Sequence, residues 1–127
     1  MAIAARAISL SETAHLHLTS EDGFTLNETG STSGTIGGAM YIHLHVSNNR
    51  GGVTAEVNIY PRDGSLTGYG SASYRVEGAE AVFSGTLSIK RGTGTYANAR
   101  ASQLRFTGSI QRRSDAVAVR LSGPLSV

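Results

Sequence analysis

The sequence predicts a single all-β domain over residues 1–127, folded as an antiparallel closed β-barrel of about eight strands. Apolar and polar residues alternate with a period of two along nearly the whole chain, and no window has the 3.6-residue period of an amphipathic helix. Glycine is abundant (16 residues) and proline scarce (2 residues), which suits twisted strands joined by tight turns. Closure into a barrel is favoured because no helix is predicted to cover an open sheet, and closure removes exposed edge strands.

The first half of the chain contains four predicted strands, over residues 13–20, 24–30, 41–46 and 53–60. The first and third carry histidine at alternate positions between aliphatic residues, in "AHLHLT" and "YIHLHV". The second and fourth, "FTLNETG" and "VTAEVNIY", alternate in the same way without histidine. The connecting sequences "EDG", "SNNRGG" and "PRDG" are rich in turn residues. Residues 1–10 precede the pattern and can form an irregular N-terminal segment.

The second half contains four more predicted strands, over residues 65–76, 79–90, 102–110 and 115–127. Their connections, such as "KRGTGTYANA" and "RRSD", again contain residues that favour turns. Several glycines fall at positions that would face the barrel interior, where they would mark sharp bends or leave internal space: Gly68, Gly70, Gly85, Gly108 and Gly123.

Composition excludes several classes of function. Without cysteine, the chain has no disulfide, no thiolate metal site and no thiol catalysis. The net charge of the chain is only +2, and the arginines of the chain are not interleaved with aromatic residues. We therefore expect no nucleic-acid partner. No apolar run approaches the ~20 residues of a membrane-spanning helix, so we expect no membrane partner. No convincing signal peptide is present, which predicts a cytoplasmic protein, with a mature secreted chain as the alternative.

Three stretches of the chain, "DGSLTGYGSASY", "AVFSGTLSIKRGTGTYANA" and "RFTGSIQRRSDAVAVRLSG", carry a resemblance to a known family. Together they resemble the allene oxide cyclase barrel group, which includes the dirigent-like proteins. The recurring feature is a turn formed here by Gly92, Thr93, Gly94, Tyr96 and Ala99, and the resemblance covers roughly the last two-thirds of the chain.

The resemblance implies a small barrel, often dimeric or trimeric, whose apolar cavity steers the cyclisation of a reactive small molecule. It therefore implies a homo-oligomer, an apolar small-molecule ligand and no required cofactor. No residue of this chain matches a catalytic residue of the plant cyclases one to one, so the resemblance assigns no catalytic role.

Three polar residues share the alternation of the apolar, inward-facing positions: Glu28, Tyr74 and Asp115, the last near a rim of the barrel. A carboxyl group inside an apolar barrel favours its neutral form, which makes Glu28 a candidate proton donor or acceptor. Tyr74 could orient a substrate carbonyl. The alternative for Glu28 is a structural role at a strand end, where it would cap turn amides or pair with an arginine.

The resemblance implies a small-molecule-binding barrel that acts as a cofactor-independent cyclase or isomerase and holds a flexible apolar substrate in a reactive shape. Glu28 and Tyr74 are its candidate catalytic residues. The candidate ligand contacts are Phe24, Leu26, Phe83, Phe106 and Asp115.

The four histidines His15, His17, His43 and His45 face the opposite way and predict a polar outer wall. Same-face neighbours on a strand lie ~6.5–7 Å apart, within reach of one zinc, copper or nickel ion. If the strand over 24–30 pairs between the two histidine strands, these lie ~9–10 Å apart and one ion cannot easily bind both pairs. The alternative function is therefore a non-catalytic oligomeric barrel with a surface or interface metal site. The histidines could also form only a solvated or subunit-facing polar stripe.

Overall fold

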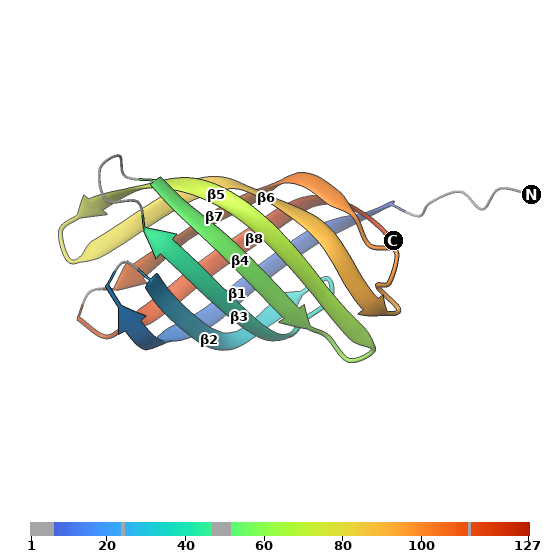
Figure 1. The fold of residues 1–127 in the computed structure, drawn as a ribbon, viewed down its shortest axis with the longest axis horizontal. Helices are drawn as coiled ribbons and strands as arrows, with labels where there is room; N and C mark the ends of the chain where they lie inside the picture. The colour runs from blue at the N-terminus through green and yellow to red at the C-terminus, as the bar shows by residue number, and fades with distance from the viewer. Residues whose placement is uncertain (1–6, 24, 47–51, 112) are drawn as a thin grey trace, which may run out of the picture.

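The computed structural model, which describes residues 7–23, 25–46, 52–111 and 113–127, is a closed barrel of eight antiparallel strands in sequential order (Figure 1). It confirms the predicted fold class. The strands are β1 (Ala7–Asp22), β2 (Thr25–Gly34), β3 (Gly38–Val46), β4 (Gly52–Tyr60), β5 (Gly64–Glu77), β6 (Glu80–Gly94), β7 (Ala101–Gln111) and β8 (Ala116–Ser126). Within the described ranges, no helix is long and apolar enough to cross a membrane.

The barrel closes through β1, which pairs with β2 on one side and with β8 on the other. His15, for example, lies opposite Ser31 of β2 and Ala118 of β8. The pairing with β8 extends back to Ala7, so residues 7–10 are regular strand rather than part of an irregular N-terminal segment. The strand β1 that closes the barrel is therefore longer than the segment 13–20 that alternation in the sequence predicts.

Alternation along each strand separates the interior from the outer wall. On β3, the side chains of Met40, Ile42 and Leu44 are buried, whereas Tyr41 and His43 are exposed. Buried apolar side chains come from every strand except β2, whose buried residues are Glu28 and Thr32. Seven strands therefore contribute buried apolar side chains to the interior, whereas the buried side chains of β2 are polar.

The inward glycines accommodate large neighbouring side chains rather than leaving internal space. A Cβ atom at Gly70 would lie 2.8 Å from Cδ1 of Leu87, which faces it from β6. At Gly108 an added Cβ would overlap the ring of Phe83, which lies directly opposite on β6. The space that these glycines free is filled by Leu87 and Phe83, so the predicted internal space is absent at both positions.

The two ends of the barrel differ. At the left end in Figure 1, which we call the mouth, β1, β3, β5 and β7 end and β2, β4, β6 and β8 begin. At the opposite end, the buried carboxylate of Glu12 accepts hydrogen bonds from the Thr32 hydroxyl (2.9 Å) and from the backbone N–H groups of Ile36 (2.7 Å) and Gly37 (3.0 Å). Glu12 thus ties the β2–β3 turn to β1.

Candidate ligand-binding site at the barrel mouth

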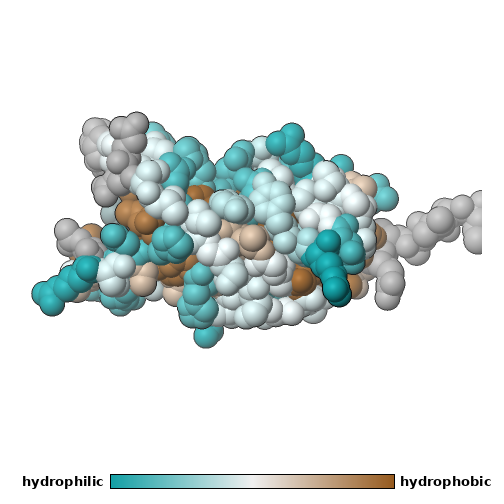
Figure 2. Space-filling model, turned by 90° about the horizontal axis from the view of Figure 1, so that it is seen from below, coloured by the Kyte–Doolittle hydropathy of each residue, from teal (hydrophilic) through white to brown (hydrophobic). Residues whose placement is uncertain are grey.

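A pocket of about 410 Å³ opens at the mouth of the barrel. Its size lies within the ~300–1,000 Å³ range of ordinary small-molecule sites. Figure 2 shows brown, apolar surface at this left-hand end of the molecule. The pocket is lined mainly by apolar side chains from five strands, with two polar residues: Leu18, Leu26, Val76, Ala81, Ile110, Gln111 and Asp115.

The apolar wall of the pocket follows from strand register. Val76 pairs with Ala81, and Ala81 pairs with Ile110, so three adjacent strands end in apolar inward-facing residues at the same level. Val76 is 54% exposed, which is unusual for a residue on the apolar side of its strand. The mouth therefore offers an apolar surface that the barrel's own side chains leave open to solvent.

Glu28 lies directly beneath this pocket. It pairs with Leu18 on β1 and with Ile42 on β3, and it faces the same side of β2 as Leu26, two residues away. Directly paired side chains on one face lie ~4.5–5.5 Å apart, and same-face neighbours along a strand lie ~6.5–7 Å apart. Two of the residues that line the pocket, Leu18 and Leu26, are therefore immediate neighbours of Glu28.

The carboxyl group of Glu28 is buried without a partner. The residue is 1% exposed, and neither Oε1 nor Oε2 has a hydrogen-bond partner among the described residues. Desolvation by burial raises the pKa of Glu28 from 4.5 to about 8. The inward position predicted for Glu28 is therefore found, and the alternative of turn-capping or pairing with an arginine is not seen in the described part of the chain. At neutral pH the group is mostly an uncharged carboxylic acid.

A second buried glutamate of the barrel, Glu12, has a structural role and provides a comparison for Glu28. It is 2% exposed, yet its carboxylate accepts three hydrogen bonds from the β2–β3 region. Glu12 is not among the residues singled out from the sequence, although its alternation with Leu10 and Ala14 places it on the inward side of β1. The two buried acids therefore differ in whether the fold supplies them with partners.

Of the other residues predicted to form the site, some line the mouth pocket and others do not. Asp115 lines the mouth pocket, and its backbone, with a φ of 59°, accepts a hydrogen bond from the N–H of Leu18 (3.0 Å). Leu26 also lines the pocket, whereas Phe24 lies outside the described residues. Tyr74 is half-buried opposite Phe83 and lines a separate hollow of about 140 Å³. Tyr74 therefore does not line the pocket above Glu28.

Two of the three predicted aromatic ligand contacts, Phe83 and Phe106, are buried in the interior. Phe83 and Phe106 are 3% and 1% exposed, and their ring centroids lie 5.2 Å apart. Neither lines the mouth pocket. Val76, Ala81 and Ile110 line the pocket and were missed. They share a simple signal, because each is the inward-facing position nearest the turn at the mouth end of its strand.

All four histidines are exposed on the outer wall, as their alternation indicates. Strand β2 separates the two pairs, because His17 lies opposite Thr29, which in turn lies opposite Tyr41. No group of three or more His, Asp or Glu side chains is placed to hold a metal ion in the part of the chain that the structure describes. The structure therefore does not bring the two pairs together into one metal site within a subunit.

The mouth pocket and the acid beneath it are the features from which a function can be argued. No protein-family model, curated protein or solved structure matches this chain.

Proposed function

We propose that the protein binds an apolar small molecule in the barrel mouth and acts on it with Glu28, as a cyclase or isomerase that needs no cofactor. The observation that carries the proposal is the buried carboxyl group of Glu28, which has no partner among the described residues and neighbours Leu18 and Leu26 in the wall of an apolar pocket. Buried polar groups in folded proteins almost always have hydrogen-bond partners, and exceptions gather at functional sites. A bound ligand can supply the missing partner.

The protonated form of Glu28 suits acid catalysis. With a pKa of about 8, the carboxylic acid keeps its proton at neutral pH and can donate it to a carbonyl or epoxide oxygen of the ligand. The surrounding side chains of Leu18, Leu26 and Ile42 exclude water, which strengthens that hydrogen bond. In an isomerisation the carboxylate formed then takes a proton from another atom of the same molecule. The proton balance closes without a co-reactant.

The pocket suits a substrate with a flexible apolar body. Among the described residues of its walls, only Gln111 and Asp115 have polar side chains, so these walls constrain the shape of a ligand more than they bind its polar groups. Holding a flexible chain in a reactive conformation can by itself supply a large part of a cyclisation's rate acceleration. The resemblance to the allene oxide cyclase barrel group supports the same type of reaction.

Binding at the mouth can be tested with a neutral apolar fluorophore, N-phenyl-1-naphthylamine, and with native mass spectrometry of the protein as purified. We expect the Ile110→Trp variant to bind neither the fluorophore nor any ligand retained from the host, because the larger indole side chain fills the pocket. The control variant Tyr41→Trp places an indole ring on the outer wall and should change neither fluorophore binding nor the amount of retained ligand. Equal binding by wild type and Ile110→Trp would place the ligand elsewhere and overturn the proposal.

The role of Glu28 is tested on the molecule that mass spectrometry identifies, or on an unsaturated fatty-acid epoxide if none is retained. Glu28→Gln keeps the size of the protonated side chain but cannot donate an acidic proton. We expect turnover to be abolished while fluorophore binding is kept. The matched control is Glu56→Gln on the outer wall, which should turn over normally. Full activity in Glu28→Gln would remove Glu28 from the chemistry.

A further inference from the structure

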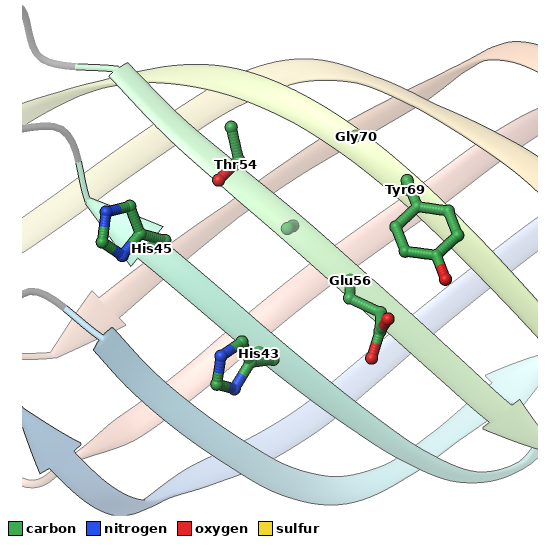
Figure 3. A pocket seen from close by; sticks show the side chains of 7 residues that line it. His43, His45, Thr54, Glu56, Tyr69 and Gly70 are labelled. Carbon is green, nitrogen blue, oxygen red and sulfur yellow. The ribbon is translucent and has the colours of Figure 1, made fainter.

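A second hollow lies on the outer wall formed by β3, β4 and β5. Figure 3 shows His43, Glu56 and Tyr69 on three adjacent strands around it, with His45 and Thr54 beside them. Its volume is about 340 Å³. His43 lies directly opposite Glu56, and Glu56 lies directly opposite Tyr69, so the three side chains form one row across the strands. The hollow is a surface groove and is separate from the barrel interior.

Exposed aromatic rings gather on the same wall. Tyr41, Tyr60 and Tyr69 are 46%, 49% and 42% exposed, and among the described residues the only other exposed large hydrophobic side chain is Val76 at the mouth. The rings of Tyr41 and Tyr60 pack edge to face, with their centroids 5.5 Å apart. Together they line a neighbouring hollow of about 380 Å³. Tyr41 and His43 are same-face neighbours on β3, ~6.5–7 Å apart, so the two hollows adjoin.

The polar groups of this wall are held in place by one another. His43 Nδ1 hydrogen-bonds to Asn27 Oδ1. Asn58 donates to Glu56 Oε2 (3.5 Å) and accepts a hydrogen bond from the Thr67 hydroxyl (2.9 Å). These contacts orient the imidazole and the carboxylate and leave their other atoms free to bind. Pre-oriented groups lose less entropy on binding a ligand.

The charge on the wall argues against an anionic ligand. Among the described residues, no lysine or arginine lines either hollow, and the one salt bridge found there, Arg75 with Glu77, lies outside both. Glu56 contributes a carboxylate, which accepts hydrogen bonds from hydroxyl groups and repels phosphates. The other polar side chains of this wall, of tyrosine, asparagine, histidine and threonine, supply hydrogen-bond donors and acceptors, and the aromatic ones combine apolar faces with polar tips.

From this combination we propose that the outer wall of β3–β5 is a binding site for a neutral carbohydrate chain. The exposed tyrosine rings would stack on the C–H faces of sugar rings. Glu56, Asn58 and His43 would bind the hydroxyl groups between them. Two adjoining shallow hollows suit an extended chain better than a compact apolar molecule, and strand faces of other small barrels bind oligosaccharides in this way. The proposal is independent of any ligand at the mouth.

The proposal is tested by calorimetric and NMR titration with four neutral hexasaccharides: cellohexaose, laminarihexaose, maltohexaose and hexa-N-acetylchitohexaose. We expect at least one to bind and to shift the amide signals of β3–β5. Tyr41→Ala and Tyr69→Ala should each weaken that binding about tenfold or more, as for exposed aromatic residues that dominate an interface. Both residues are on the surface, so thermal melts should show the variants folded.

Two control variants distinguish sugar binding at this wall from binding at the mouth or elsewhere on the barrel. Arg120→Ala changes an exposed residue on β8 and should leave sugar binding unchanged. Glu28→Gln should also leave it unchanged, so failure at the mouth and failure on the outer wall are distinguishable. The proposal is overturned if no hexasaccharide binds at millimolar concentration, or if the tyrosine variants bind as wild type does. It is equally overturned if these variants abolish only a self-association seen in sedimentation, which would make the wall a subunit contact.

Discussion

At the scale of single residues, the barrel contains two buried glutamates with opposite roles. Glu12 is fully provided with hydrogen-bond donors, whereas Glu28 has none among the described residues. Burying a polar group without a partner costs on the order of 1–3 kcal/mol, and more if the group is charged. The fold tolerates that cost at Glu28 because the carboxyl group remains protonated.

The titration of Glu28 makes stability depend on pH in a direction unusual for a glutamate. Its pKa is 4.5 when exposed and about 8 in the folded protein, so between these values the folded chain holds a proton that the unfolded chain has released. Raising the pH through this window therefore favours unfolding. Each unit of pKa difference corresponds to about 1.4 kcal/mol, so the total loss amounts to several kcal/mol.

We expect urea denaturation at pH 5, 7 and 9 to show the free energy of unfolding falling with pH in wild type. In Glu28→Gln the same measurement should show a smaller fall, because the amide does not titrate. Glu56→Gln serves as the control and should follow wild type. Parallel pH profiles for wild type and Glu28→Gln would mean that the pKa of Glu28 is not raised in solution.

At the scale of elements, the β2–β3 turn depends on one side chain from another strand. Two of its backbone N–H groups and the Thr32 hydroxyl all donate to the Glu12 carboxylate. We expect Glu12→Ala to lower the free energy of unfolding by roughly 2–4 kcal/mol, since charged hydrogen bonds are lost and buried donors are left unpaired. Hydrogen exchange should speed up at Ile36 and Gly37. Unchanged exchange there would show that the turn holds without Glu12.

The outer faces of β1 and β3 lead to a prediction about metals. With β2 between them, the pairs His15–His17 and His43–His45 should act independently. Titration with zinc should show weak binding, with His17→Ala affecting only the first pair and His45→Ala only the second. Binding should weaken below pH ~6.5, where imidazole is protonated. Loss of all binding in both single variants would instead mean one shared site, for example across a subunit contact.

At the scale of the whole molecule, one apolar face per strand and the lack of a predicted helix to cover an open sheet were enough to predict closure. Alternation also placed Glu28 inside and the histidines outside. A period of two assigns each residue to a face wherever the strand is regular. Depth within the barrel depends on how far neighbouring strands are shifted against each other, which alternation does not encode. For that reason Phe83 and Phe106 were predicted at the ligand and lie in the interior, while Val76 and Ile110 were missed at the mouth.

The close packing of side chains against glycines in the barrel interior leads to a further prediction. Phe83 occupies the space above Gly108, so Gly108→Ala forces the ring or the strand to move. We expect a loss of about 1–3 kcal/mol in the free energy of unfolding, which is typical of overpacked cores. Ser109→Ala, next to it on β7, is the matched control and should change stability little. Equal stability of Gly108→Ala and wild type would show that the interior can rearrange around Phe83.

Closure through β1 and β8 also fixes how the barrel would be oriented if it were attached to something. Ala7 pairs with Ser126, so the start of β1 and the end of β8 lie together, at the end of the barrel opposite the mouth (Figure 1). A tether, a fused domain or a solid support joined through either of these strand ends would hold the molecule by its base. The mouth would then point away from the attachment and stay open to ligands in the surrounding medium.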